Sequence, residues 1–163
     1  MTVTRRVSSD APWEQAVGYS RAVAAGDFVF VTGCTSVEHG EVIHEGNARA
    51  QTAHAIANVE SALTRLGADL TDVVRTRMFV TDISRWQEIG DAHREAFGDV
   101  MPATSMVQVA ALIDPRLLVE VEAVAYKPGI GGAAAAADAS AGGVLDEAAV
   151  ERPAAAAGLG WPG

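Results

Sequence analysis

The sequence predicts a single α+β domain in which a mixed sheet carries two helices on one face. Residues 1–127 alternate between segments of strand periodicity and segments of helix periodicity, in the order β-β, helix, β, helix, β-β. The 163-residue chain is long enough for one domain with its own core. Its 49% hydrophobic and 20% charged residues are typical of a globular protein.

The first two predicted strands form a hairpin. Residues 28–33 (Phe-Val-Phe-Val-Thr-Gly) are rich in β-branched and aromatic residues, which favour strands. Gly26 and Asp27 before them are a turn signal, so residues 21–25 are expected to be the partner strand.

The first predicted helix covers residues 47–66. Its apolar and small residues recur at intervals of three and four, which places them on one helical face. Asn47 is the expected N-cap and Gly67 the expected stop. The residues of this face are Thr52, Ala55, Ile56, Val59, Ala62, Leu63 and Leu66.

The second half of the domain repeats the alternation. Residues 73–81 alternate as a strand, and residues 84–87 (Ser-Arg-Trp-Gln) match a capping box that begins a second helix. Gly98 is expected to end that helix, and strands are predicted at 104–111 and 117–126. The apolar face of the second helix is predicted to be Trp86, Ile89, His93, Ala96 and Phe97.

Two further features bear on organisation. Residues 128–163 contain 13 Ala and 8 Gly in 36 positions, too little large apolar surface to offset the cost of ordering, so we expect a flexible tail outside the 1–127 domain. The sheet face that carries no helices must also be covered, and self-association is the simplest way to cover it.

Composition excludes several classes of function. A net charge of −9 with a single lysine, Lys127, argues against nucleic acid and against an anionic membrane surface as partners. No apolar run is long enough to span a bilayer, and the first residues lack a secretory signal, so a cytoplasmic location is expected. One cysteine and four scattered histidines give no metal motif and no intramolecular disulfide.

Seven short segments resemble the YjgF/YER057c/UK114 (Rid) family, whose older label is endoribonuclease L-PSP. The resemblance covers about residues 17–127. The segments are Gly18-Tyr-Ser-Arg-Ala-Val23, Gly26-Asp-Phe-Val-Phe-Val-Thr-Gly33, Gln51-Thr52 with Ala57-Asn58-Val59, Asp72-Val-Val-Arg-Thr76, Phe79-Val-Thr-Asp82, Pro102-Ala-Thr-Ser105 and Val119-Glu-Val-Glu-Ala-Val-Ala125.

The resemblance implies a chorismate-mutase-like fold that assembles as a homotrimer. It also implies small-molecule clefts at the subunit interfaces. The best-known members hydrolyse reactive enamines and imines, such as 2-aminoacrylate, to a 2-oxo acid and ammonia. The resemblance implies neither a metal nor an organic cofactor.

Thr104 departs from the family pattern. Deaminating members have Pro-Ala-Arg-Ser where this chain has Pro102-Ala-Thr-Ser105, and their arginine binds the substrate carboxylate through two charge-assisted hydrogen bonds. Losing a charged partner costs about 2–3 kcal/mol, so a different substrate is expected. Arg21 or Arg77 could supply the missing charge, or each could be an ordinary surface arginine.

Glu120 matches the acidic residue that the resemblance implies orients or activates the attacking water. Glu122 lies two positions further on the same strand face, and both glutamates could instead face solvent. We expect the Tyr19 hydroxyl, the backbone N–H of Gly33 and Ser105 to bind the substrate. Tyr19 could equally be a packed tyrosine and Gly33 a simple turn glycine.

Cys34 and His93 complete the set of candidates for substrate binding. Cys34 follows Gly33 directly, and it could be a nucleophile or a small buried residue. His93 lies on the predicted apolar face of the second helix. It could be a core or interface histidine, or an acid or base if it lines the cleft.

These residues leave three functions open. The first is an enzyme acting on an imine, an enamine or a related intermediate, by hydrolytic deamination or similar chemistry. The second is a trimeric metabolite-binding protein without turnover. The third is the ribonuclease activity of the older family label, which the charge of −9 disfavours.

Overall fold

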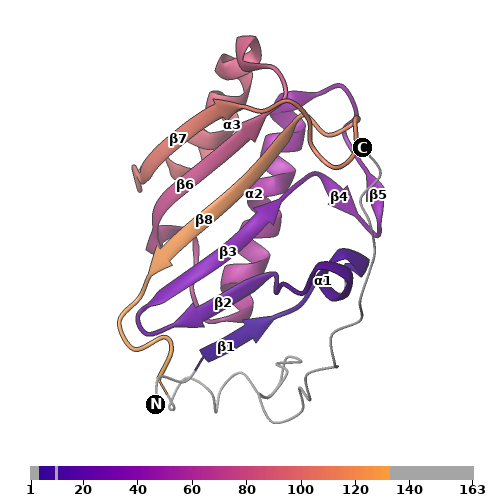
Figure 1. The fold of residues 1–163 in the computed structure, drawn as a ribbon. Helices are drawn as coiled ribbons and strands as arrows, with labels where there is room; N and C mark the ends of the chain where they lie inside the picture. Colours follow the sequence, from indigo (N-terminus) through magenta and orange to yellow (C-terminus); the bar gives the residue numbers. More distant parts are fainter. Residues whose placement is uncertain (1–3, 10, 133–163) are drawn as a thin grey trace.

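The computed structural model describes residues 4–9 and 11–132, which form a six-stranded sheet in the order β1-β2-β3-β8-β6-β7 (Figure 1). Strands β6 and β7 pair in parallel and all other neighbours in antiparallel fashion, so the sheet is mixed. The strands are β1 (Thr4–Val7), β2 (Ala22–Ala25), β3 (Phe28–Cys34), β6 (Val73–Val80), β7 (Ala103–Gln108) and β8 (Val119–Tyr126); β4 (Val37–Glu38) and β5 (Glu41–Val42) form a separate hairpin.

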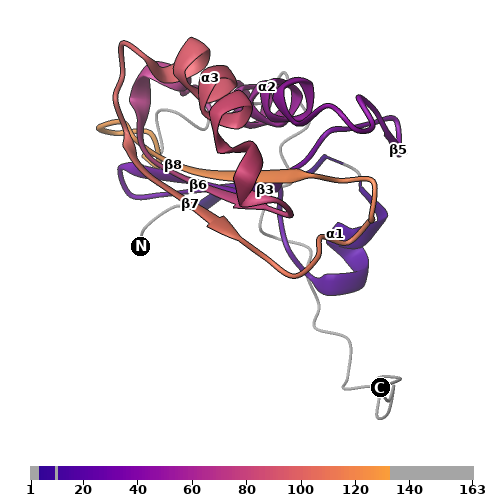
Figure 2. The same cartoon turned by 90° about the horizontal axis from the view of Figure 1, so that it is seen from above.

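Two helices, α2 (Ala48–Arg65) and α3 (Trp86–Phe97), lie on one face of this sheet (Figure 2). In the part of the chain that the structure describes, no comparable helix covers the other face, which we call the uncovered face. A short helix, α1 (Pro12–Val17), follows β1, and the 3-10 turns η1 (Leu70–Asp72) and η2 (Ile83–Arg85) flank β6. The predicted fold class, α+β with two helices on one face of a mixed sheet, is confirmed.

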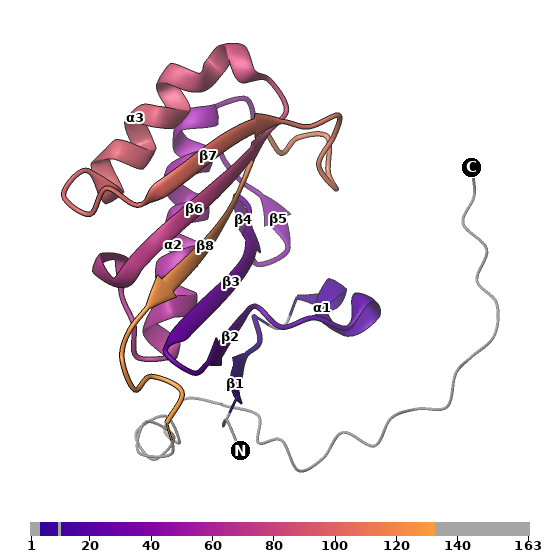
Figure 3. The same ribbon diagram turned by 60° about the vertical axis from the view of Figure 1, so that its left-hand side comes forward.

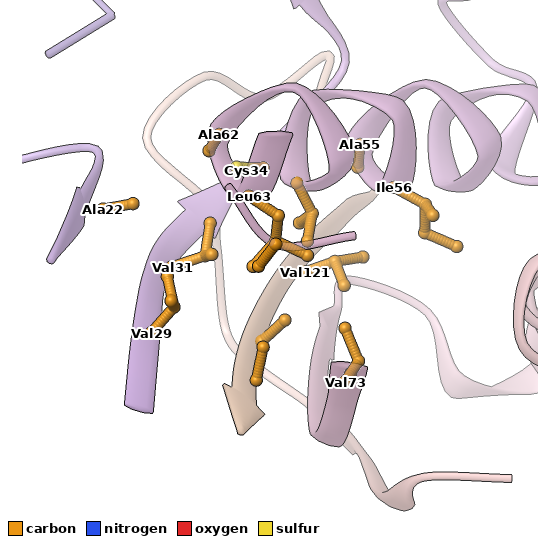
Figure 4. Packing of buried hydrophobic residues seen from close by; sticks show 14 of the residues in the cluster. Ala22, Val29, Val31, Cys34, Ala55, Ile56, Ala62, Leu63, Val73 and Val121 are labelled. Atoms are coloured by element: carbon orange, nitrogen blue, oxygen red, sulfur yellow. The ribbon is translucent and has the colours of Figure 1, made fainter. Parts of the chain in front are cut away.

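The core lies between α2 and the central strands β3 and β8. Along β8, burial alternates from residue to residue, so that Val119 and Val121 are buried while Glu120 and Glu122 face away from the helices. Val121 from β8 and Val31 from β3 point toward α2 (Figure 4). The same strand therefore supplies both the core and the polar side chains of the uncovered face.

The second helix begins later than the capping-box pattern predicted. The side chain of Asp82, not that of Ser84, is the cap: it accepts a hydrogen bond from the Ser84 backbone N–H at 2.9 Å and caps η2. The 3-10 turn changes the helical phase, and α3 begins only at Trp86. Trp86 is 57% exposed, so the prediction that it lies on the apolar face of this helix is wrong. Ile89 and Phe97 of the predicted face are buried.

Packed contacts continue beyond β8 to Gly132. The backbone N–H of Lys127 donates to the carbonyl of Asp27 at 2.8 Å, and Ile130 is buried, with its carbonyl accepting from Arg5 at 3.0 Å. The rest of the predicted tail, residues 133–163, lies outside the described residues. Within the described ranges, none of the helices is long and apolar enough to cross a bilayer.

Gln51 on α2 fixes the start of β8. Its side chain is fully buried and donates to the carbonyl of Arg116 at 2.9 Å and to that of His44 at 3.3 Å. Its Oε1 accepts a hydrogen bond from the backbone N–H of Leu118 at 2.7 Å. A single amide therefore ties the helix to the segment that leads into Glu120.

Replacing Gln51 with Leu should lower the free energy of unfolding by about 2–3 kcal/mol, because a buried N–H and two carbonyls lose their partner. Urea unfolding measures this change. Gln87→Leu is the matched control, because Gln87 is exposed on α3 and its loss should change stability by about 0.5 kcal/mol or less. Equal effects of the two substitutions would contradict the assigned role of Gln51.

Candidate functional site

The carboxyl group of Glu120 lies against Gly33, in the space where any other residue would have a side chain. Strands β3 and β8 pair with Cys34 opposite Val121, and their register shifts between Val31 and Cys34. A Cβ added to Gly33 would lie 2.2 Å from Glu120 Oε1. The absence of a side chain at residue 33 therefore makes room for the carboxylate.

The surroundings of Glu120 favour its protonated form. The side chain is partly buried, and this burial raises its pKa above the usual glutamate value. The negative charge of Glu122 raises the pKa further, while the positive charge of Arg21 opposes both effects. A carboxyl group with a raised pKa can both give and accept a proton closer to neutral pH than an ordinary glutamate.

Arg21 contacts the backbone of the same glycine, Gly33. Its Nη1 donates to the carbonyl of Gly33 at 2.7 Å, and its Nε donates to Ser9 Oγ at 3.3 Å. The same Nε lies 3.7 Å from Glu14 Oε1, and the Tyr19 ring centre lies 5.8 Å from the guanidinium carbon. Together with Glu120 and Cys34, the predicted residues Tyr19, Arg21 and Gly33 form one group, which we call the β3–β8 cluster.

Cys34 is the innermost member of this cluster. The residue is buried, its Sγ donates to the carbonyl of Thr32 at 3.3 Å, and Arg21 Nη1 lies 3.6 Å from the sulfur. Burial raises the pKa of the thiol despite the nearby arginine. These surroundings fit a small buried thiol better than an activated nucleophile.

Thr104 and His93 lie in a second group, on the side of the sheet that α3 covers. Thr104 Oγ1 is 2.9 Å from Thr76 Oγ1, which is 2.9 Å from His93 Nε2. Each threonine hydroxyl has one proton to donate. The Thr104 hydroxyl donates its proton to the carbonyl of Pro102 at 3.0 Å, so it accepts a hydrogen bond from the Thr76 hydroxyl. Because the Thr76 proton is then used, Thr76 accepts a hydrogen bond from His93 Nε2–H. This direction requires only that Nε2 carries a proton. Burial lowers the pKa of His93, which favours the neutral ring with its single proton on Nε2.

Ser105 points to the opposite face from Thr104, because neighbouring residues of a strand alternate. In the sheet register it lies beside Arg77, which lies beside Glu122 of β8. Arg77 forms an ion pair with Glu122, so its charge already has an acidic partner. Ser105 thus shares the uncovered face with Glu120 and Glu122, whereas Thr104 and His93 do not.

Sequence reasoning missed Glu14, Ser9 and Thr76. Thr76 appeared only as one residue of an alternating strand, and its hydroxyl joins His93 to Thr104 through a register that spacing does not reveal. Glu14 stands in a short segment without periodicity. Across residues 4–9 and 11–132, no group of three or more His, Cys, Asp or Glu side chains is arranged to hold a metal ion.

Comparison with solved structures defines the class of protein. Rv2704 from Mycobacterium tuberculosis, described as a member of the highly conserved YjgF/YER057c/UK114 family, is 52% identical with a TM-score of 0.69, over 76% of this chain and 98% of that one. Escherichia coli TdcF, solved with bound serine, is 25% identical with a TM-score of 0.63, over 76% and 94% of the two chains.

The family model described as Endoribonuclease L-PSP matches residues 9–127, and the chain belongs to this family. The resemblance found in the sequence is therefore confirmed. SCO2049 of Streptomyces coelicolor is 39% identical over 76% of this chain and 92% of its own length. The 3-aminoacrylate deaminase RutC of Acinetobacter baylyi is 33% identical over 66% of this chain and 86% of its own length.

Gly33→Ala should displace the Glu120 carboxyl group while changing the free energy of unfolding by about 1 kcal/mol or less. The φ angle of Gly33 is not positive, so the backbone accepts alanine, and the flexible glutamate side chain moves instead. We expect the pKa of Glu120, measured by carboxyl ¹³C NMR, to fall as the group moves toward solvent. Gly90→Ala on α3 is the control, because its Cβ would meet nothing within 4 Å; it should leave Glu120 unchanged and add about 0.5–1 kcal/mol of stability.

Glu120→Gln should stabilise the protein at pH 7 but not at pH 4. Because the folded-state pKa of Glu120 is raised, the folded state loses stability as pH rises from the unfolded pKa through the folded pKa. Glutamine is neutral at every pH and avoids this loss. Thermal unfolding at both pH values measures the difference, with Glu122→Gln as a control that loses the ion pair with Arg77 and gains no stability. A stability gain that is the same at both pH values would contradict the raised pKa.

Proposed function

We propose that the protein is an enzyme that hydrolyses a small imine or enamine in a cleft between the subunits of a homotrimer. The observation that carries this proposal is the Glu120 carboxyl group, held against Gly33 with a raised pKa and near polar groups on the uncovered face. Membership of the family and the similarity to the deaminase RutC support the same chemistry.

Glu120 supplies the proton transfers that imine hydrolysis needs. As the oxygen of water bonds to the imine carbon, Glu120 accepts one proton from the water and gives it to the imine nitrogen, which produces a neutral carbinolamine. The hydroxyl proton of the carbinolamine then passes through Glu120 to the nitrogen as the carbon–nitrogen bond breaks and the carbonyl forms. The products are a carbonyl compound and ammonia, and an enamine reaches the same path through its imine tautomer. The Gly33 N–H, the Tyr19 hydroxyl and Ser105 hold the substrate.

A homotrimer would cover the apolar part of the uncovered face. Phe28, Phe30, Val107 and Tyr126 are exposed, Phe30 to 49%, and the Phe28 and Tyr126 ring centres lie 5.2 Å apart. Exposed apolar groups of this kind mark interaction sites. The Thr104 end of β7 is also at the edge of the sheet, where a neighbouring copy would complete a cleft with the β3–β8 cluster.

The proposed substrate differs from the substrates of deaminating relatives because it lacks a carboxylate at the position near Thr104. Serine and 3-aminoacrylate, the compounds associated with TdcF and RutC, both carry a carboxylate. In this chain the corresponding position is Thr104, whose hydroxyl proton is directed to Pro102, and both candidate substitutes, Arg21 and Arg77, are paired with glutamates. A substrate without a carboxylate at this position therefore fits the site better.

Wild-type protein should release pyruvate from 2-aminoacrylate only slowly, and Thr104→Arg should raise this rate about 30-fold to 150-fold. The factor corresponds to the roughly 2–3 kcal/mol of a charge-assisted hydrogen bond. The assay generates 2-aminoacrylate in place and follows pyruvate. Thr104→Gln adds a side chain without charge and should give no increase. Wild-type turnover as fast as that of Thr104→Arg would contradict the substrate proposal.

Glu120→Gln separates an enzyme from a binding protein without turnover. If Glu120→Gln loses imine hydrolysis but still binds a carbonyl compound that resembles the product, the protein is an enzyme. The reason is that glutamine keeps the size of the side chain but does not act as a proton acceptor. Unchanged hydrolysis in Glu120→Gln would remove Glu120 from the mechanism and leave the metabolite-binding alternative as the better description.

A further inference from the structure

We infer that Arg21, held in place by Glu14, is a positioning residue: it fixes the Gly33 peptide against which the Glu120 carboxyl group lies. The inference rests on the proposed function only for its catalytic consequence. It assigns to Glu14 a role in the site, and it gives Arg21 a different role from that of a substitute for the missing substrate-binding arginine.

Glu14 is a buried, ionised anchor for this arrangement. The residue is 6% exposed, and its carboxylate accepts hydrogen bonds from Ser8 Oγ at 2.6 Å, Ser9 N–H at 2.9 Å and Ser9 Oγ at 2.5 Å. Burial alone would raise the pKa of Glu14, but these hydrogen bonds and the charge of Arg21 together lower it. The carboxylate is therefore charged at neutral pH and attracts the guanidinium.

Among the described side chains of α1, no buried apolar residue explains why Glu14 is buried. Among the α1 side chains that the structure describes, Glu14 alone is buried, while Trp13 and Val17 are exposed. The backbone carbonyl of Glu14 also accepts hydrogen bonds from the N–H groups of Gly18 and Tyr19. The side chain and the backbone of Glu14 therefore both hold the segment that leads to β2. Figure 3 shows α1 beyond the β1–β2 end of the sheet. A buried ion pair is weak as a source of stability, which makes precise placement of Arg21 the better explanation.

The guanidinium of Arg21 is already engaged by the protein. It is 15% exposed, and its Nη1 and Nε bond Gly33 and Ser9 at the same time. The planar fork of arginine permits this simultaneous contact, whereas the single ammonium of lysine would not reproduce it. Arg21 thus binds the carbonyl of Gly33, and the Glu120 carboxyl group lies against the Gly33 α-carbon. Movement of the Gly33 peptide would therefore move the surface against which Glu120 packs.

The charged and titratable groups facing Glu120 are Arg21 from the segment before β2, Cys34 from β3 and Glu122 from β8. Arg21 is the positive charge among them. Its removal takes away the one effect that lowers the pKa of Glu120 and leaves the effects of burial and of Glu122, so the titration of Glu120 should change measurably.

The test uses the full chain labelled with ¹³C at glutamate carboxyls, with Glu120→Gln identifying the Glu120 signal. Arg21→Met should raise the Glu120 titration midpoint by about half a pKa unit or more and speed amide hydrogen exchange at residues 33–35 by about tenfold. Arg21→Lys keeps the charge, so it should speed the exchange with a smaller change in titration. Arg94→Met is the control, because Arg94 is 76% exposed on α3 and pairs with Asp91; it should change neither quantity.

Glu14→Gln should also speed exchange at residues 33–35, and with Arg21→Lys it provides the test if Arg21→Met does not fold. The inference is overturned if the Arg21 variants match Arg94→Met, or if exchange rises uniformly along the chain. Neither readout needs turnover, so absent imine hydrolysis would remove the proposed function alone. Where hydrolysis is measured, Arg21→Met should lower kcat, whereas a raised KM with unchanged kcat would assign Arg21 to the substrate.

Discussion

The antiparallel pairing of β3 with β8 is the constraint on which both the core and the site depend. This register turns Val31 and Val121 toward α2 and, by the same alternation, turns Glu120 and Glu122 away from it. A slip of one residue would place two glutamates in the core. The irregularity between Val31 and Cys34 then brings Gly33 under Glu120, so the functional geometry is a local departure from a register that the core enforces.

Periodicity predicted the elements that bury a regular face, and it failed where a short segment or a turn decides the structure. Helix α2 was predicted with its Asn47 cap, because its apolar positions recur through 18 residues. Asp82 and Ser84 are both good caps, and the sequence does not reveal that a 3-10 turn uses the first. The four residues of β1 and the six of α1 are too few to show a period, and among the described side chains of α1 no apolar one is buried.

The family resemblance named the candidate site residues one by one, but the sequence did not predict which of them lie together. Glu120 and Gly33 lie together, while Thr104 points to the helix-covered side and reaches His93 through Thr76. That separation depends on the pairing of β6 with β7, which is a contact between distant parts of the chain. Glu14 was not predicted for the same reason, because its carboxylate meets Arg21 only after the chain has turned at Gly18.

The two arginines nearest the site lead to one conclusion about its charge. Arg21 is paired with Glu14 and Arg77 with Glu122, so each cation is balanced before any ligand binds. Whenever Glu120 is ionised, the site therefore carries a negative charge, which repels carboxylates and the phosphates of RNA alike. The chain as a whole carries a charge of −9, which acts in the same direction. The proposed substrate is therefore a neutral or cationic imine, because such a molecule would use the proton transfers proposed for Glu120 and would not need the missing arginine.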